Sequence, residues 1–239
     1  MQIAALAAKY NIRVMTNYQM AWWPANYVAK AAVDHGDIGT VYRLHGIVGH
    51  GGPGSSGPRQ KYFFDWLTDP VQNGAGALMD FGCYNALWSL WYMGRPESVY
   101  AEVIHLRPQT FPKVEDSAAM MLRYPTGINV FEGSWDLPRS FQDVEVFGSS
   151  AAPDGKLTLG SVHMTRQKVE VRPERGQPSE LPLAALPPEK ADPIAFMVDA
   201  MKSNKPIEGI TALDINVGVV EIIEAAKESI KTGRAVKLK

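Results

Sequence analysis

Residues 74–88 read GAGALMDFGCYNALW, and this stretch says more about the fold than any other. Its apolar pattern continues to residue 93 and stops before a glycine and a proline, which predicts a buried helix over 75–93. Asp80 and Tyr84 stand four residues apart, so a helix places their carboxylate and phenol on one face. Buried polar groups need partners, which a hydroxyl-rich ligand would supply. Capping by Asp80 and core packing by Tyr84 explain the spacing equally well.

Strand-like runs lie on both sides of this helix and are joined mostly by short turns. Neighbouring strands with short turns favour an antiparallel over a parallel sheet. We therefore predict the α+β class: an open, mainly antiparallel sheet with helices on one face. The predicted strands are 41–48, 99–105, 116–124, 128–135, 143–148, 156–159, 167–171 and 235–238.

The remaining segments predict further helices and one exposed loop. A helix over 24–35 begins with a proline and ends at Gly36, and two more helices follow residue 192. Residues 49–58 are rich in glycine and proline and predict a loop of the kind that borders ligands. At the start of the chain, a helix over 2–10 and a strand over 12–16 look like the closing unit of a βαβ domain whose earlier units are missing.

The composition limits the classes of molecule that the protein is expected to bind. The 239 residues include 24 basic and 25 acidic residues, so a net charge of -1 gives no field that attracts nucleic acid or anionic lipid. No apolar run reaches the ~18 residues that a membrane helix needs. Cys83 has no second cysteine to pair with, and no signal peptide is recognisable. We expect a cytoplasmic protein with small-molecule ligands and neither nucleic acid nor membrane as a partner.

A set of motifs in fixed order resembles the Gfo/Idh/MocA oxidoreductases, which act mainly on sugars and cyclitols. The resemblance covers essentially the whole chain. It implies that residues 1–17 are the last helix and strand of a nucleotide-binding Rossmann domain, and that 18–239 form the substrate-binding domain. The motifs are NYQMAWWP (17–24), HGDIGTVYRL (35–44), DWLTDP (65–70), GAGALMDFGCY (74–84), VEDSAAMMLRYPTG (114–127) and EVFGSS (145–150).

The resemblance also implies roles for residues on the central helix. An Asp-x-Gly-x-His motif supplies the acid-base residue in this family, and Asp80, Gly82 and Tyr84 match the branch with tyrosine, similar to glucose-fructose oxidoreductase and dihydrodiol dehydrogenase. Tyr84 would exchange the proton of the reacting hydroxyl, while Asp80 would orient the sugar or tune the tyrosine. A phenol with a pKa near ~10 needs such help at neutral pH.

Other side chains are candidates for substrate binding. His50 stands at the mouth of the glycine loop, and Tyr18 and Trp22 could stack on a sugar face, although solvation and core packing explain them as well. Glu132 could pair with Asp80 for hydrolysis, as could Glu115, Asp116 and Asp136; each is more ordinarily a solvated strand or turn residue. No histidine has metal-ligand spacing, so we expect no metal site.

Two features of the cofactor site are absent from the sequence: the glycine-rich βα turn and the Glu-Lys-Pro motif. Gly52, Gly54 and Gly57 spell G-x-G-x-x-G, but no helical pattern follows them, which argues against a dinucleotide site. We therefore expect no cofactor in this chain, whereas the full-length family uses NAD or NADP.

Three functions remain open. The first is a truncated sugar oxidoreductase substrate domain that binds a carbohydrate-like ligand and cannot perform redox chemistry alone. The second is a stand-alone enzyme that uses the sugar pocket for hydrolysis, of glycosidase or esterase type, or for a lyase step. The third is a non-catalytic sugar-binding or interaction protein. A homo-oligomer formed through the open sheet face fits all three, because that face would otherwise be a large apolar patch.

Overall fold

The computed structural model describes residues 2–54 and 58–238, which fold around one open sheet. Within these ranges the sheet has nine strands in the order β8-β7-β6-β5-β1-β4-β3-β2-β9. Neighbouring strands are antiparallel except β1 and β4, which are parallel. The strands are β1 (Thr40–Gly49), β2 (Ser98–Ile104), β3 (Ser117–Tyr124), β4 (Gly127–Ser134), β5 (Phe141–Ala151), β6 (Leu157–Met164), β7 (Val169–Pro173), β8 (Ser179–Leu181) and β9 (Val236–Lys237).

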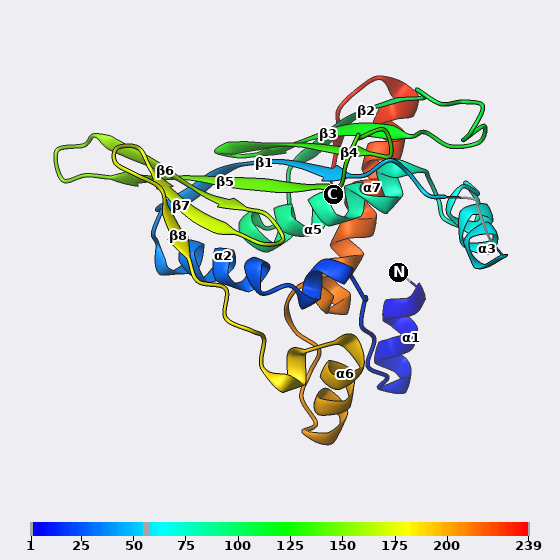
Figure 1. The fold of residues 1–239 in the computed structure, drawn as a ribbon, viewed down its shortest axis with the longest axis horizontal. Coiled ribbons are helices and arrows are strands. Elements are labelled where there is room, and N and C mark those ends of the chain that lie inside the picture. The colour runs from blue at the N-terminus through cyan, green and yellow to red at the C-terminus, as the bar shows by residue number, and fades with distance from the viewer. Residues whose placement is uncertain (1, 55–57, 239) are drawn as a thin grey trace.

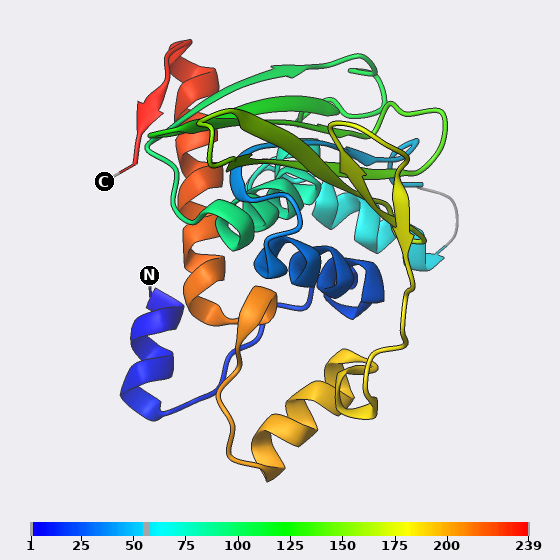
Figure 2. The same ribbon diagram turned by 90° about the vertical axis from the view of Figure 1, so that its left-hand side faces the viewer.

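The large helices cover one face of this sheet, as Figures 1 and 2 show. Helix α5 packs under β1 and β4 at the centre of the sheet, α7 under β2 near one edge, and α2 under β6 and β7, which confirms the predicted α+β architecture. The α-helices are α1 (Gln2–Tyr10), α2 (Pro24–His35), α3 (Pro58–Leu67), α4 (Ala77–Asp80), α5 (Gly82–Met93), α6 (Pro193–Lys202) and α7 (Leu213–Thr232); the 3-10 turns are η1 (Gln19–Trp22), η2 (Pro188–Lys190) and η3 (Gly209–Thr211).

Alternation along the strands separates a covered face from an open one. In β3, Ala118, Met120 and Leu122 are buried under the helices, whereas Ala119 and Met121 between them are exposed. Side chains two residues apart share a face, so one strand serves both the core and the outer surface.

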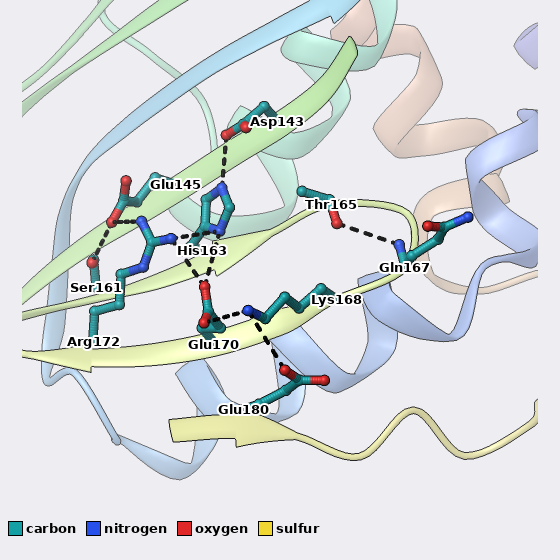
Figure 3. A network of polar contacts seen from close by, with 10 residues as sticks. All are labelled: Asp143, Glu145, Ser161, His163, Thr165, Gln167, Lys168, Glu170, Arg172 and Glu180. Carbon is teal, nitrogen blue, oxygen red and sulfur yellow. Dashed lines mark hydrogen bonds and ion pairs between the residues drawn. The ribbon is translucent and has the colours of Figure 1, made fainter. Parts of the chain in front are cut away.

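On the open face, β5, β6 and β7 carry a network of charged side chains, drawn in Figure 3. The guanidinium of Arg172 lies 3.2 Å from Glu145 and 3.0 Å from Glu170. His163 contacts Asp143 at 2.8 Å, and its Nδ1 lies 2.9 Å from Arg172. Because these charges are paired with one another, this end of the open face can stay in contact with water.

Two expectations for secondary structure are wrong. Residues 12–16 form no strand: only an isolated bridge joins Met15 to Ala212, because the segment runs beside a 3-10 turn that offers no strand edge. A helix, α3, follows the glycine loop where none is expected. It exposes most of its described side chains and has a Lys61–Asp65 pair one turn apart, so it lacks the apolar stripe that marks a core helix.

The helix expected over 75–93 is interrupted at Phe81. Phe81 has φ −115° and ψ −30°, and the amide of Tyr84 bonds the carbonyl of Phe81, a step of three residues instead of four. Close packing accompanies the break: a Cβ on Gly133 of β4 would lie 3.0 Å from the Cβ of Phe81. Asp80 therefore ends one short helix and Tyr84 lies in the first turn of the next.

The carboxylate of Glu115, just before β3, holds the start of α4. Its Oε1 accepts hydrogen bonds from the amides of Gly76 (2.8 Å) and Leu78 (2.9 Å), and its backbone carbonyl accepts one from Ala77 (3.1 Å). These amides are the donors that a helix leaves without partners in its first turn. Glu115 thus caps the helix that carries Asp80 and is not available as its catalytic partner.

Replacing Glu115 with alanine removes this cap. We expect the free energy of unfolding to fall by about 1–2 kcal/mol, the usual cost of losing a helix N-cap. Glu115→Gln keeps a carbonyl oxygen at the same position and should cost less than half as much. Urea denaturation of both variants checks this, and equal losses in the two would contradict the capping role.

Candidate functional site

Asp80, the last residue of α4, lies beside the end of strand β4. The indole Nε1 of fully buried Trp135, the residue after β4, donates a hydrogen bond to Asp80 Oδ2 at 2.9 Å. Burial raises the pKa of Asp80 above its usual value, and the Trp135 bond and nearby His50 offset only part of this rise. The carboxyl group therefore keeps its proton to a higher pH than a solvated aspartate does.

Tyr84 stands beside Asp80 within a group of aromatic rings. Its ring contacts Tyr18 edge-on at 5.4 Å between centroids, and Phe81 and Trp88 lie at 6.3 and 6.5 Å. Burial, then Cys83 and Asp80, all raise the pKa of the Tyr84 phenol. The hydroxyl is therefore held in its protonated form, as a hydrogen-bond and proton donor.

The orientation of His50 is fixed by the glycine loop. Its Nδ1 accepts a hydrogen bond from the amide of Gly52 at 2.9 Å, and its ring meets Phe81 edge-on at 5.1 Å. Since an amide can only donate, the proton of the neutral imidazole belongs on Nε2. His50 thus has an N–H left to donate to a ligand.

Asp80, Tyr84 and His50 line one pocket of about 500 Å³, a volume in the range of small-molecule sites. The end of β1, the glycine loop, helix α3, the α4–α5 junction, the start of β5 and the turn between β6 and β7 form its walls. Several groups in these walls can bond hydroxyls. The polar lining residues include Gln19, His50, Asp80, Tyr84, Ser140, Gln142 and Arg166.

The other predicted binding residues are placed differently. Tyr18 is buried and packs against the ring of Tyr84. Trp22 lines a separate hollow with Tyr27 and Phe196, and its indole donates to Asn17 at 2.8 Å. Glu132 is exposed on the open face of the sheet, because it alternates with the inward residues of β4. Trp22 and Glu132 are therefore not brought to the Asp80 pocket.

Two of the remaining candidate carboxylates have structural partners. Asp116 is buried and accepts hydrogen bonds from the amides of Leu106 and Arg107 at 2.8 and 2.6 Å. Asp136 lies 2.7 Å from the guanidinium of Arg107. Both groups tie the loop before β3 to the end of β4, and neither lines the pocket.

Sequence reasoning missed Trp135, Gln142 and Arg166. The first holds Asp80, and the other two line the pocket. All three lie in or next to strands of the sheet, at least 55 residues after Asp80, so local spacing cannot connect them to it. The wall they build depends on strand order, which brings β4, β1, β5 and β6 side by side.

The glycine loop does not fit a nicotinamide dinucleotide. A pyrophosphate turn needs free amides between a strand and a helix that crosses to a neighbouring parallel strand. Here the Gly52 amide is bonded to His50, and Arg107 donates to the carbonyl of Gly51 at 3.2 Å. The parallel partner of β1 is β4, which the chain reaches only after β2 and β3. Gly57 lies outside the described residues.

Within residues 2–54 and 58–238, no group of three or more His, Cys, Asp or Glu side chains could hold a metal ion. No helix in this part of the chain is both long and apolar enough to cross a membrane.

Comparison with known sequences matches residues 28–152 to a profile described as the GFO/IDH/MocA C-terminal domain. That match takes in β1, the central helices and the whole of β5, and so most of the pocket wall. No curated protein matches the chain.

Solved structures share the fold at low sequence identity. Aldose-aldose oxidoreductase from Caulobacter crescentus, complexed with glycerol, is 20% identical with a TM-score of 0.76, covering 99% of this chain and 67% of that one. An NAD binding oxidoreductase from Klebsiella pneumoniae is 16% identical, with a TM-score of 0.76 and coverage of 100% and 69%. A levoglucosan dehydrogenase in complex with NADH and levoglucosan is 17% identical, with a TM-score of 0.71 and coverage of 90% and 63%. This chain thus spans about two thirds of their length.

Burial of Asp80 predicts a pH-dependent stability. Since its pKa is raised on folding, its favourable contribution is complete below the unfolded value of about 3.9 and is lost as pH rises through the folded value. Asp80→Asn removes this titration and keeps an acceptor for Trp135. At pH 8 we expect the variant to have the higher Tm, by about 2–4 °C for each kcal/mol gained. Calorimetry from pH 4 to 8 measures the gap, which should narrow toward pH 4; a variant less stable at every pH contradicts the assignment.

Proposed function

We propose that this chain, which belongs to the GFO/IDH/MocA family through its C-terminal domain, binds a carbohydrate-like ligand between Asp80 and Tyr84 and moves the proton of one ligand hydroxyl. The observation that carries the proposal is the convergence of a carboxyl, a phenol and an imidazole N–H on one pocket. Solved proteins of the same fold support it, since their names include an aldose oxidoreductase and a dehydrogenase in complex with levoglucosan.

The acid-base chemistry follows from the environment of the phenol. With its pKa raised by burial, Cys83 and Asp80, Tyr84 stays protonated at neutral pH, so it can donate to a ligand oxygen but cannot take a proton from one. The reverse transfer, from hydroxyl to tyrosinate, requires a cation brought close to the phenol. Asp80 accepts a hydrogen bond from a ligand hydroxyl when ionised and donates one when protonated.

The proposal assigns no redox step to the described residues. NAD or NADP is the oxidant or reductant of the full-length family, and the names of two related structures include NAD or NADH. Because the glycine loop does not fit a pyrophosphate, we assign this chain the binding of the sugar and the movement of its proton, and do not assign its glycine loop to the cofactor's phosphates.

The glycosidase alternative lacks a second carboxylate. Hydrolysis of a glycosidic bond uses two carboxyl groups about 5–10 Å apart. Asp80 is the one carboxylate among the described residues that line the pocket. Glu132 lies on the opposite face of the sheet, and Glu115, Asp116 and Asp136 are bonded to backbone or to Arg107. We therefore favour the oxidoreductase reading over glycoside hydrolysis.

Tyr84→Phe tests the proposed site. The change removes one hydroxyl and leaves the ring volume nearly intact, so the Tm should change little. For any sugar that the wild type converts, turnover should fall about 100-fold or more, the range for losing an acid-base group. Steady-state kinetics of Tyr84→Phe measure this loss, with Tyr18→Phe as the matched control in the neighbouring ring. Equal rates for the wild type and Tyr84→Phe would refute the role of Tyr84.

We further infer that two copies associate through the open face of the sheet. The charged network of Figure 3 occupies β5 to β7, whereas the part over β1, β4 and β3 presents the apolar side chains of Ile47, Val130 and Met121, with His45 and Glu132 beside them. Ile104 on β2 is 59% exposed and extends this apolar area. A twofold dimer presents one such area to another, covering the apolar part on both copies at once.

Met121→Glu tests the dimer. Twofold symmetry brings the new charges of both copies into the same interface, so the dissociation constant should rise at least about 10-fold. Multi-angle light scattering over a dilution series measures the mass. Met201→Glu places the same charge on exposed α6 and should leave the dimer intact. A wild type that is monomeric at every concentration would rule this interface out.

A further inference from the structure

Arg166 is an exposed residue whose side chain lines the same pocket as Asp80, and it has no acidic partner within the part of the chain that the structure describes. It belongs to the turn between β6 and β7 and lies over the ring of Trp23, 5.1 Å from its centroid. Among the described residues, no carboxylate lies within ion-pair distance of it. Arg172 on the same hairpin, by contrast, is paired with Glu145 and Glu170.

Both the turn and the ring under Arg166 are well held. The amide of Thr165 donates to the carbonyl of Lys168 at 2.9 Å, which closes the turn around Arg166. Trp23 is 7% exposed and stands between η1 and α2. A guanidinium that rests on an aromatic face is less hydrated than a free ammonium and keeps its fork of N–H donors for a planar anion. Arg166 is therefore suited to bind a carboxylate through two parallel hydrogen bonds.

Strand order separates Arg166 from Asp80 across the pocket. Arg166 follows β6, and Asp80 is held by Trp135 at the end of β4, with β5 and β1 between them. Three strand spacings amount to about 14 Å at the backbone. An extended arginine side chain and one sugar ring in line cover a distance of that order.

The groups between these two ends suit a neutral polyol. Gln19, Ser140 and Gln142 line the pocket and offer amide and hydroxyl groups. Such groups bond hydroxyls in either direction without favouring a charge. By strand order, Arg166 and the Asp80–Tyr84 pair lie at opposite ends of the pocket, and Gln142 of β5 lies between them.

We propose that the ligand of this pocket is a sugar acid, whose carboxylate binds Arg166 while a hydroxyl at the far end of the molecule meets Asp80 and Tyr84. The inference rests on the proposed function and names its substrate class. Arg166 acts in it as a specificity-determining residue that contacts the ligand and takes no part in proton transfer.

Matched pairs of sugars test the charge directly. Isothermal titration of the full chain with D-glucuronate and D-galacturonate, against D-glucose and D-galactose, compares ligands that share a ring and differ in the carboxylate. We expect at least one acid to bind more tightly than its neutral counterpart. Arg166→Gln should weaken binding of that acid about 10-fold to 100-fold, the range for hydrogen bonds to a charged group, and change binding of the neutral sugar less than twofold.

Arg175→Gln is the matched control, since it removes the same charge from an exposed position beyond the other end of β7 and should leave all affinities unchanged. Tm values of both variants verify folding. Equal affinity of the wild type for acids and neutral sugars, or an equal loss for both in Arg166→Gln, overturns the inference and leaves the sugar site standing. Tighter binding of D-glucose 6-phosphate than of either acid also overturns it, in favour of a phosphate. A wild type that binds none of these sugars contradicts the proposed function itself.

Discussion

Hydrogen bonds to the carboxylate of Glu115 hold the one segment on which the site depends. By capping α4, Glu115 ties a helix of only four residues to the start of β3, and the indole of Trp135 then fixes the far end of that helix through Asp80. A half-buried carboxyl and a half-buried phenol are costly to keep next to each other unless both find polar partners. These anchors hold them at the pocket wall, where a polyhydroxylated ligand can supply the partners that the protein does not.

Much of the fold could be predicted from sequence patterns that act between residues close together in the chain. The helix over 24–35 and its stop at Gly36 are confirmed, because a proline start and a left-handed glycine stop act over single turns. The one-sided sheet is confirmed for a similar reason: antiparallel neighbours joined by short turns follow from sequence order. Asp80, Tyr84 and the glycine loop line one pocket. The two side chains reach it together although the helix is interrupted at Phe81 between them.

Features that depend on strand order could not be predicted from the sequence. The register of β4 with β1 and β3 decides which face of the sheet Glu132 occupies. A shift of one residue would turn its side chain to the other face; in the observed register the side chain is exposed on the open face. Trp22 was assigned to the sugar site from its neighbours in sequence, yet it packs on Phe196 of α6. Arg166 reaches the pocket only because β6 lies two strands from β1. No spacing in the sequence carries that information.

A crystal structure of the chain grown with D-glucuronate tests the central claim most directly, because it locates the ligand without assuming any activity. The account predicts one sugar ring in the pocket at the end of β1, with an oxygen within hydrogen-bond distance of Tyr84 and the carboxylate on Arg166. A ligand seated instead in the hollow beside Trp22, with the Asp80 pocket filled only by water, would contradict it.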